Sequence, residues 1–280
     1  MAYKTILLHL DDIRRADRLL EVALPLADKM DAHVIAFNIM PPHVIITGGD
    51  MGVGAVVVDD HREAYRSEAA RLKERFTTAT KYRPAKSEWR QIDAGFNSAT
   101  QVIIEHSHVC DLIVVNQKDP DWALSQFLEE PERIAVETGR PVLLVPNKGK
   151  LVMPPKRATI AWNGRREAVR AVFDALPLLI GTDEVNIIWI SPEQDQPNAG
   201  DLPGAELGTI LSRHGIKCTV SQSTVVDISV ASELLRQSHA FGSDVLVMGA
   251  YGHSRLREFV LGGASRDILL HMDLPVLMSH

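Results

Sequence analysis

Residues 247–265 read Val-Met-Gly-Ala-Tyr-Gly-His-Ser-Arg-Leu-Arg-Glu-Phe-Val-Leu-Gly-Gly-Ala-Ser. The apolar run that leads into this stretch, at 244–248, is typical of a buried strand, and the apolar residues at 268–270 favour a helix after it. Glycine lets the backbone approach a ligand closely and adopt positive φ, so a glycine loop between a strand and a helix allows amides to surround an anion. The stretch therefore predicts a phosphate-binding loop.

The first half of the chain alternates between short apolar runs and amphipathic segments, which is typical of a parallel sheet with helices on both faces. The glycine-rich segment 43–60 lacks the Gly-Lys-Ser/Thr of a Walker loop, so a mobile loop or a dimer flap is favoured there. Strands are predicted at 4–10, 32–39, 86–92, 111–116 and 141–145, and helices at 14–30, 61–80, 97–106 and 125–138.

The pattern starts again after a linker at 146–155, which indicates an internal duplication. An Ala-Leu-Pro-Leu sequence recurs at 23–26 and 175–178, and Asp183 matches Asp31, both at an offset of 152. The fourth strands match at an offset of 133, so the first half holds 19 more residues, for which 43–60 is the natural place. We predict an α/β fold of two tandem domains, 1–150 and 151–280. Each would be a five-stranded open parallel sheet with helices on both faces, and the two would pack like a fused homodimer.

Composition narrows the possible functions. The chain has 280 residues, of which 45% are hydrophobic and 24% are charged, so a packed core is expected. A net charge of -6 argues against a general nucleic-acid binder. Two distant cysteines do not make a disulfide framework, and no apolar run approaches the roughly 18 residues of a membrane helix. Because no signal-peptide pattern opens the chain, we expect a cytoplasmic protein without a membrane partner.

The glycine loop resembles the nucleotide loop of the universal stress protein family, Gly-x-x-Gly-x9-Gly-(Ser/Thr). Here Gly249 and Gly252 are followed by nine residues and then by Gly262 and Gly263. The whole chain resembles the tandem form of that family, whose fold is Rossmann-like, of the adenine nucleotide alpha-hydrolase type. The nucleotide motif covers only the second half. The resemblance implies ATP or ADP, with or without Mg²⁺, in the second half, and a role in stress response as a nucleotide-dependent regulator.

Carried over position by position, the resemblance places Met248 beside the adenine and makes the end of the second strand, around Trp189, a wall for the base. Asn163 falls where the family usually has an aspartate that contacts the nucleoside. His253 lies inside the loop and is a candidate for a phosphate contact, for a general base, or for a solvated residue. The complete predicted binding set is Asn163, Trp189, Met248, Gly249, Gly252, His253, Gly262, Gly263, Ala264 and Ser265.

Two positions depart from the family pattern. Asn163 keeps hydrogen-bonding capacity but loses the charge of an aspartate. Gly263 stands where a Ser or Thr is usual, and the lost hydroxyl is worth about 0.5–1.5 kcal/mol, up to about tenfold in affinity, although Ser265 could substitute. In the first half, Asp11 occupies the aspartate position, but the loop at 116–122 is acidic and has no glycine. We therefore expect a first domain with a degenerate loop and a structural role.

Other readings of the chain stay open. The spacing His106-x-His108-x-Cys110 offers metal-ligand types, but histidine at a helix end is also favoured electrostatically. No catalytic residues are predicted, and at most weak ATP hydrolysis is expected. The alternatives to a regulator are a slow ATPase that uses His253 and Mg²⁺, and a binder of another small anionic metabolite. An internal pseudo-dimer is expected, and a homodimer of the whole chain is possible.

Overall fold

The computed structural model describes residues 2–40, 56–121, 130–192, 203–225, 227–250 and 263–280. Its strands form one ten-stranded sheet in the order β3-β2-β1-β4-β5-β10-β9-β6-β7-β8. The first five strands are β1 (Thr5–His9), β2 (His33–Met40), β3 (Ser87–Asp93), β4 (Leu112–Asn116) and β5 (Val142–Val145). The second five are β6 (Arg157–Ala161), β7 (Glu184–Pro192), β8 (Cys218–Val225), β9 (Val245–Gly249) and β10 (Val276–Ser279).

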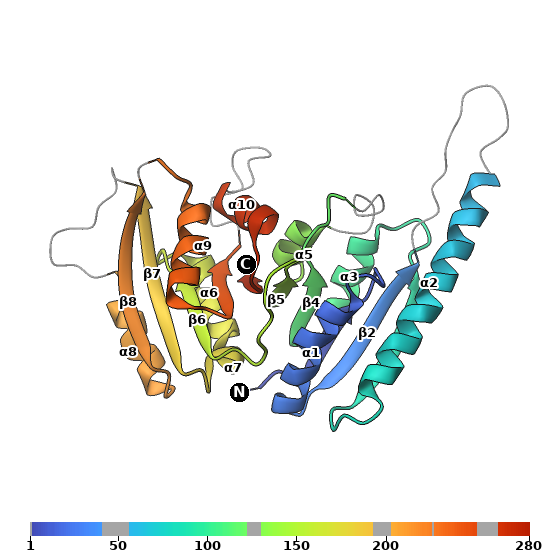
Figure 1. The fold of residues 1–280 in the computed structure, drawn as a ribbon, viewed down its shortest axis with the longest axis horizontal. Helices are drawn as coiled ribbons and strands as arrows, with labels where there is room; N and C mark the ends of the chain where they lie inside the picture. Colours follow the sequence, from blue (N-terminus) through green and yellow to red (C-terminus); the bar gives the residue numbers. More distant parts are fainter. Residues whose placement is uncertain (1, 41–55, 122–129, 193–202, 226, 251–262) are drawn as a thin grey trace.

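Within each half, all strand pairs are parallel, and the two halves have the same internal order. The prediction of five-stranded parallel sheets is thus confirmed. The two sheets are joined by a single antiparallel pair, in which β10 lies beside β5 with Leu277 opposite Leu143. In Figure 1 the first half, in blue and green, and the second half, in yellow to red, lie on either side of this junction.

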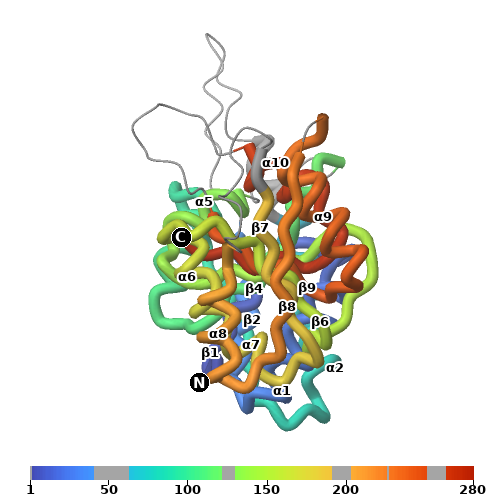
Figure 2. The backbone as a smooth tube through the Cα atoms, turned by 90° about the vertical axis from the view of Figure 1, so that its left-hand side faces the viewer, coloured from blue at the N-terminus to red at the C-terminus, as the bar shows by residue number. Residues whose placement is uncertain are grey.

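Helices cover both faces of the sheet, as Figures 1 and 2 show. One buried cluster packs under α1 (Ala16–Met30), α2 (Val56–Thr80), α6 (Arg166–Asp174), α7 (Leu176–Leu179) and α8 (Ala205–Arg213). The other packs under α3 (Ala99–Ser107), α5 (Pro131–Glu137), α9 (Val230–Phe241) and α10 (Gly263–His271). Each cluster draws residues from both halves, so the core continues across the junction. In the described ranges, no helix is long and apolar enough to span a membrane.

The duplication is repeated in hydrogen bonds as well as in topology. The Asp111 carboxylate accepts the backbone amides of Lys4 and Thr5 at 2.7 and 2.9 Å. In the second half, Asp244 accepts the amides of Lys156 and Arg157 at 2.8 and 3.0 Å. An aspartate before the fourth strand therefore ties down the start of the first strand in both halves.

Two details differ from the sequence prediction, and the start of a third element lies outside the described residues. In β1 and β2, Thr5 pairs with His33, but in β6 and β7 Arg157 pairs with Glu184, so the second strands correspond at an offset of 151 instead of 152. Helix α2 begins at Val56, so the last part of the segment predicted as a loop or flap is helical, while 41–55 lies outside the described residues. The helix predicted at 125–138 is described from Pro131.

Candidate functional site

A cavity of about 150 Å³ lies beyond the carboxyl ends of the second-half strands. It spans the ends of β6, β7 and β9, where the strand order reverses, which is the place where open parallel sheets bind ligands. A single water molecule needs about 10–15 Å³ of such space, so the cavity has room for several. The lining consists of Ala161, Trp162, Asn163, Ala168, Ile188, Ile190, Val230, Leu234, Met248, Gly249, Gly263, Ala264 and Ser265.

The lining has an apolar part and a polar part. Aliphatic side chains from β7 and α9, together with Met248, form the apolar part. Asn163 and the first residues of α10, Gly263 to Ser265, form the polar part. The first amides of a helix lack intrahelical acceptors and carry the positive end of the helix dipole, so this part suits an anion. The cavity therefore suits a ligand with an apolar body and an anionic end.

The end of β9 is held close to the start of α6. A Cβ atom placed on Gly249 would lie 2.6 Å from the backbone nitrogen of Ala168 and 2.6 Å from the carbonyl carbon of Glu167. Such contacts cannot be relieved by rotating a side chain, because both atoms belong to the backbone. Gly249 is thus required by helix packing, a role that the sequence analysis did not assign to it.

The start of α10 is less crowded. A Cβ atom on Gly263 would meet no atom of the described structure within 4 Å. Ser265 lies two residues further along α10, also lines the cavity, and is only 5% exposed. The position where a hydroxyl was expected is therefore sterically able to carry one.

Asn163 follows β6 and is exposed at the cavity. Its Oδ1 atom accepts the backbone amide of Arg165 at 3.0 Å, a local turn that shapes the entry into α6. An aspartate oxygen would accept the same amide. The Asn163 side chain is therefore fixed at the rim of the cavity by an interaction that does not depend on a bound ligand.

Trp189 does not line the cavity, whereas its neighbours Ile188 and Ile190 do. Side chains alternate across a strand, so a residue between two cavity-lining residues faces the opposite side of the sheet. Its indole Nε1 is buried without a hydrogen-bond partner among the described residues. The tryptophan that does reach the cavity is Trp162, which the sequence analysis missed although it directly precedes Asn163.

Six of the ten predicted residues, Asn163, Met248, Gly249, Gly263, Ala264 and Ser265, thus come together around one cavity. Gly252, His253 and Gly262 lie outside the described residues.

The equivalent position in the first half is nearly filled. A space of about 10 Å³, enough for one water molecule, lies among His9, Asp11, Asn116 and Glu130. Burial raises the pKa of Asp11, whose Oδ1 atom accepts the Asn116 amide at 2.9 Å. Glu130 is the N-cap of α5, so a carboxylate stands where α10 presents glycine and alanine.

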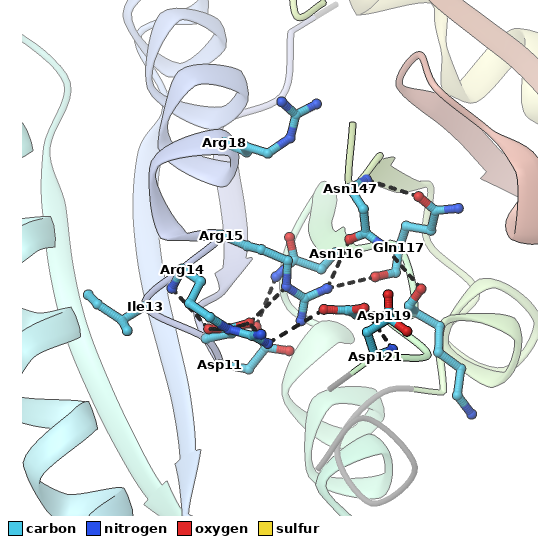
Figure 3. A network of polar contacts seen from close by, with 12 residues as sticks. Asp11, Ile13, Arg14, Arg15, Arg18, Asn116, Gln117, Asp119, Asp121 and Asn147 are labelled. Atoms are coloured by element: carbon cyan, nitrogen blue, oxygen red, sulfur yellow. Dashed lines mark hydrogen bonds and ion pairs between the residues drawn. The ribbon is translucent and has the colours of Figure 1, made fainter. Parts of the chain in front are cut away.

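A polar network occupies the first-half loop beside this space (Figure 3). The Arg14 and Arg15 guanidinium groups both bond Asp12, at 2.6 and 3.0 Å. Burial acts to raise the pKa of Asp12, but the hydrogen bonds from Arg14 and the charge of Arg15 lower it overall. Arg15 also donates to the Gln117 carbonyl at 2.9 Å and to Asn147 Oδ1 at 3.1 Å. The hydrogen-bonding groups of these side chains are therefore used by one another and are not directed at a ligand.

The His106, His108 and Cys110 triplet is dispersed. The His106 ring lies 4.8 Å from the Phe37 ring, and the His108 carbonyl accepts a bond from Arg140 at 2.9 Å. Cys110 is buried, its thiol donates to the Ser107 carbonyl, and burial raises its pKa to about 12. No group of three potential metal ligands is found in the part of the chain that the structure describes.

Comparison with known proteins agrees with this geometry. Residues 193–280 match the model of the universal stress protein family. Over these residues the chain is similar to the universal stress protein family. The match of the family model lies in the second half, which holds the cavity, whereas for the complete chain the likeness to solved structures is one of fold.

Two solved structures share the tandem arrangement. A universal stress protein from Archaeoglobus fulgidus superposes with a TM-score of 0.72 at 16% identity, over 98% of this chain and 95% of that one. A putative universal stress protein from Pseudomonas aeruginosa gives a TM-score of 0.58 at 16% identity, over 99% and 93%. Among curated sequences, universal stress protein Slr1230 from Synechocystis is 27% identical over 151 residues. That alignment covers 52% of this chain and 49% of the relative, so it spans about half the relative's length.

Proposed function

We propose that the second domain, 151–280, binds an adenine nucleotide, ATP or ADP, in the cavity between β6, β9 and α10. The observation that carries the proposal is the pairing of an apolar part, formed by Ile188, Ile190 and Met248, with the amide-bearing start of α10. A flat base suits the former and phosphate groups suit the latter. The match of residues 193–280 to the model of the universal stress protein family adds support.

The proposed stoichiometry is one nucleotide per chain. In the first domain, 1–150, the corresponding space holds about one water molecule, and the Glu130 side chain stands where α10 offers backbone amides. The first domain would then act as a structural partner. We further propose that nucleotide occupancy makes this protein a cytoplasmic regulator in stress response, since binding at the start of α10 selects among positions of a helix close to the junction.

Native mass spectrometry of the purified full chain, with and without added Mg-ATP, tests the proposal. One retained ATP or ADP per chain is expected. Two nucleotides per chain would contradict the single site. Accumulation of ADP with time would favour the slow ATPase, and an unrelated bound mass with no nucleotide at millimolar ATP would favour another anionic metabolite, for which the Asn163 and Gly263 departures leave room.

A further inference from the structure

The side chain of Gln117 crosses from the first half to the second. Gln117 follows β4, and its Nε2 atom donates to the carbonyls of Leu269 at 2.8 Å and Leu270 at 3.2 Å. Both carbonyls belong to the last turn of α10, where a helix leaves its carbonyls without intrahelical partners. One carboxamide therefore caps the far end of the helix whose first turn lines the cavity.

The orientation of this carboxamide is set by its partners, one of which, Asn147, is drawn in Figure 3. Gln117 Oε1 accepts the backbone amide of Asn147 at 2.9 Å, and an amide N–H can only donate. The two α10 carbonyls can only accept, so the assignment of Oε1 and Nε2 follows from the partners. The Gln117 backbone donates to Val145 at 2.8 Å and accepts from Arg15 at 2.9 Å. Gln117 is 5% exposed, so its bonds are shielded from competing water.

The contact breaks the symmetry of the duplication. At the offset of 133, the counterpart of Gln117 is Ala250, and the backbone positions agree, because the Ala250 amide donates to Ser279 at 2.8 Å as the Gln117 amide donates to Val145. Alanine has no side-chain donor. Gln117 of the first half therefore caps a helix of the second half, whereas its counterpart Ala250 has no side chain that could cap a helix of the first half.

We infer that Gln117 is a positioning residue for the cavity of the second half, and this inference rests on the proposed function. Helix α10 has nine residues and spans about 13 Å at 1.5 Å per residue. A helix this short moves as a unit, so a tie on its last turn sets where Gly263, Ala264 and Ser265 stand against the ligand. Through Gln117, the network of the first half tunes the affinity of the second.

The variant Gln117→Glu tests the contribution of the Nε2 donor alone. The variant keeps the size of the side chain and an oxygen for the Asn147 amide. It replaces the donor with a carboxylate beside two carbonyls at the negative end of the helix. We expect the dissociation constant for Mg-ATP, measured by isothermal titration calorimetry on the full chain, to rise on the order of three- to tenfold. Gln222→Glu adds the same charge at an exposed position on β8 and should bind as the wild type does.

Two further measurements distinguish positioning from general loss of stability. Hydrogen exchange of the free Gln117→Glu protein should accelerate in α10, including its first turn, while exchange in β1, β4 and β6 stays at the wild-type rate. In the wild type, the Gln117 side-chain amide signal, assigned by its loss in Gln117→Met, should shift when Mg-ATP is added, because coupling between two sites is reciprocal.

An unchanged dissociation constant in Gln117→Glu, or exchange that accelerates equally throughout both halves, would overturn the inference. If the wild type itself binds no nucleotide, the proposed function fails. The exchange pattern of α10 in the free variant still decides whether Gln117 positions the helix.

Discussion

At the scale of single residues, two glycines of one motif have different physical roles. Position 249 must be glycine because the backbone of α6 lies 2.6 Å from where a Cβ atom would be. A Cβ atom on Gly263 would meet none of the described residues within 4 Å. The resemblance to the nucleotide motif predicts both glycines beside a phosphate, whereas the packing role of Gly249 is visible only in the structure.

Gly249→Ala should therefore lower the thermal unfolding midpoint even without nucleotide, because α6 must shift to admit the methyl group. Overpacking of this kind costs about 1–3 kcal/mol. Thermal unfolding followed by circular dichroism measures the effect. Gly263→Ala is the matched control and should leave the midpoint nearly unchanged, and equal midpoints for the two variants would refute the packing role of Gly249.

Gly263→Ser should tighten nucleotide binding, because it adds a hydroxyl at the start of α10 where no described residue lies within 4 Å of the new Cβ. A net hydrogen bond of about 0.5–1.5 kcal/mol corresponds to a gain of up to about tenfold in affinity. Titration calorimetry with Mg-ATP, using Gly263→Ala to account for the added carbon, provides the measurement. Identical affinities of the Ser and Ala variants would show that the hydroxyl makes no contact.

Trp189 shows where residue-level prediction from sequence fails. Strand alternation makes the direction of a side chain depend on register, and a change of one residue reverses it. The second strands of the two halves correspond at 151 and the helices before them at 152, a difference that no composition pattern reveals. The positions next to strand ends and at the helix start, such as Met248 and Ser265, were predictable because the motif fixes them directly.

At the scale of elements, the helix α9, which lines the cavity, is held in place by hydrogen bonds to its buried Glu233. Glu233 is 2% exposed and accepts hydrogen bonds from Arg236, Gln237 and Ser223. The bonds from Arg236 lower the pKa of Glu233 to about 2, and those from Ser223 and Gln237 add to this against the effect of burial. Val230 and Leu234 of the same helix line the cavity, so this network fixes the apolar wall.

Because the folded pKa of Glu233 lies below its unfolded value of about 4.5, its contribution to stability is complete above that pH and is lost as the pH falls toward 2. Glu233→Gln should consequently be less stable than the wild type at pH 7, and the difference should shrink between pH 4.5 and 2. Urea unfolding midpoints at several pH values test this. Glu105→Gln, at an exposed site on α3, is the control. A difference that does not vary with pH would contradict the pKa of Glu233.

Elements were the most predictable part of the molecule, since apolar periodicity and helix caps are local. Ser98 and Ser229 cap the helices α3 and α9, and the side chain of each accepts the backbone amide three residues later. Helix α2 was predicted to begin at 61 but begins at Val56, because an apolar Val-Val-Val start carries no cap signal. The cap that Gln117 supplies to α10 was not predictable, since it joins residues 152 positions apart.

At the scale of the whole molecule, the sheet crosses from one half to the other without a break. Leu143 and Leu277 face each other across the antiparallel pair, and both are fully buried. Further contacts cross the junction, including Tyr3 Oη to the Asp174 carbonyl at 2.6 Å and Arg170 to the Gly139 carbonyl at 3.1 Å. The duplication was visible in the sequence, but the antiparallel joining of the two sheets was not.

We predict that the two halves unfold together. The shared core makes opening of one half expose apolar surface of the other, which favours a single cooperative transition. Tryptophan fluorescence can follow each half alone. Trp162→Phe with Trp189→Phe leaves reporters only in the first half, and Trp89→Phe with Trp122→Phe leaves them only in the second. Each double variant's urea midpoint is corrected for the change in stability that calorimetry measures for its substitutions. The corrected midpoints of the two halves should coincide, and two separate transitions in one chain would disprove the coupling.

The contact of Gln117 with α10 also has a consequence for how such a molecule can diversify. In a pair of identical chains, every substitution appears on both sides of the symmetry axis, so a glutamine placed to cap the partner's helix would cap both helices. Joining the two copies in one polypeptide removes that constraint. One half can then keep Ala250 while the other acquires Gln117, so the two halves of a duplicated chain can take on different structural roles.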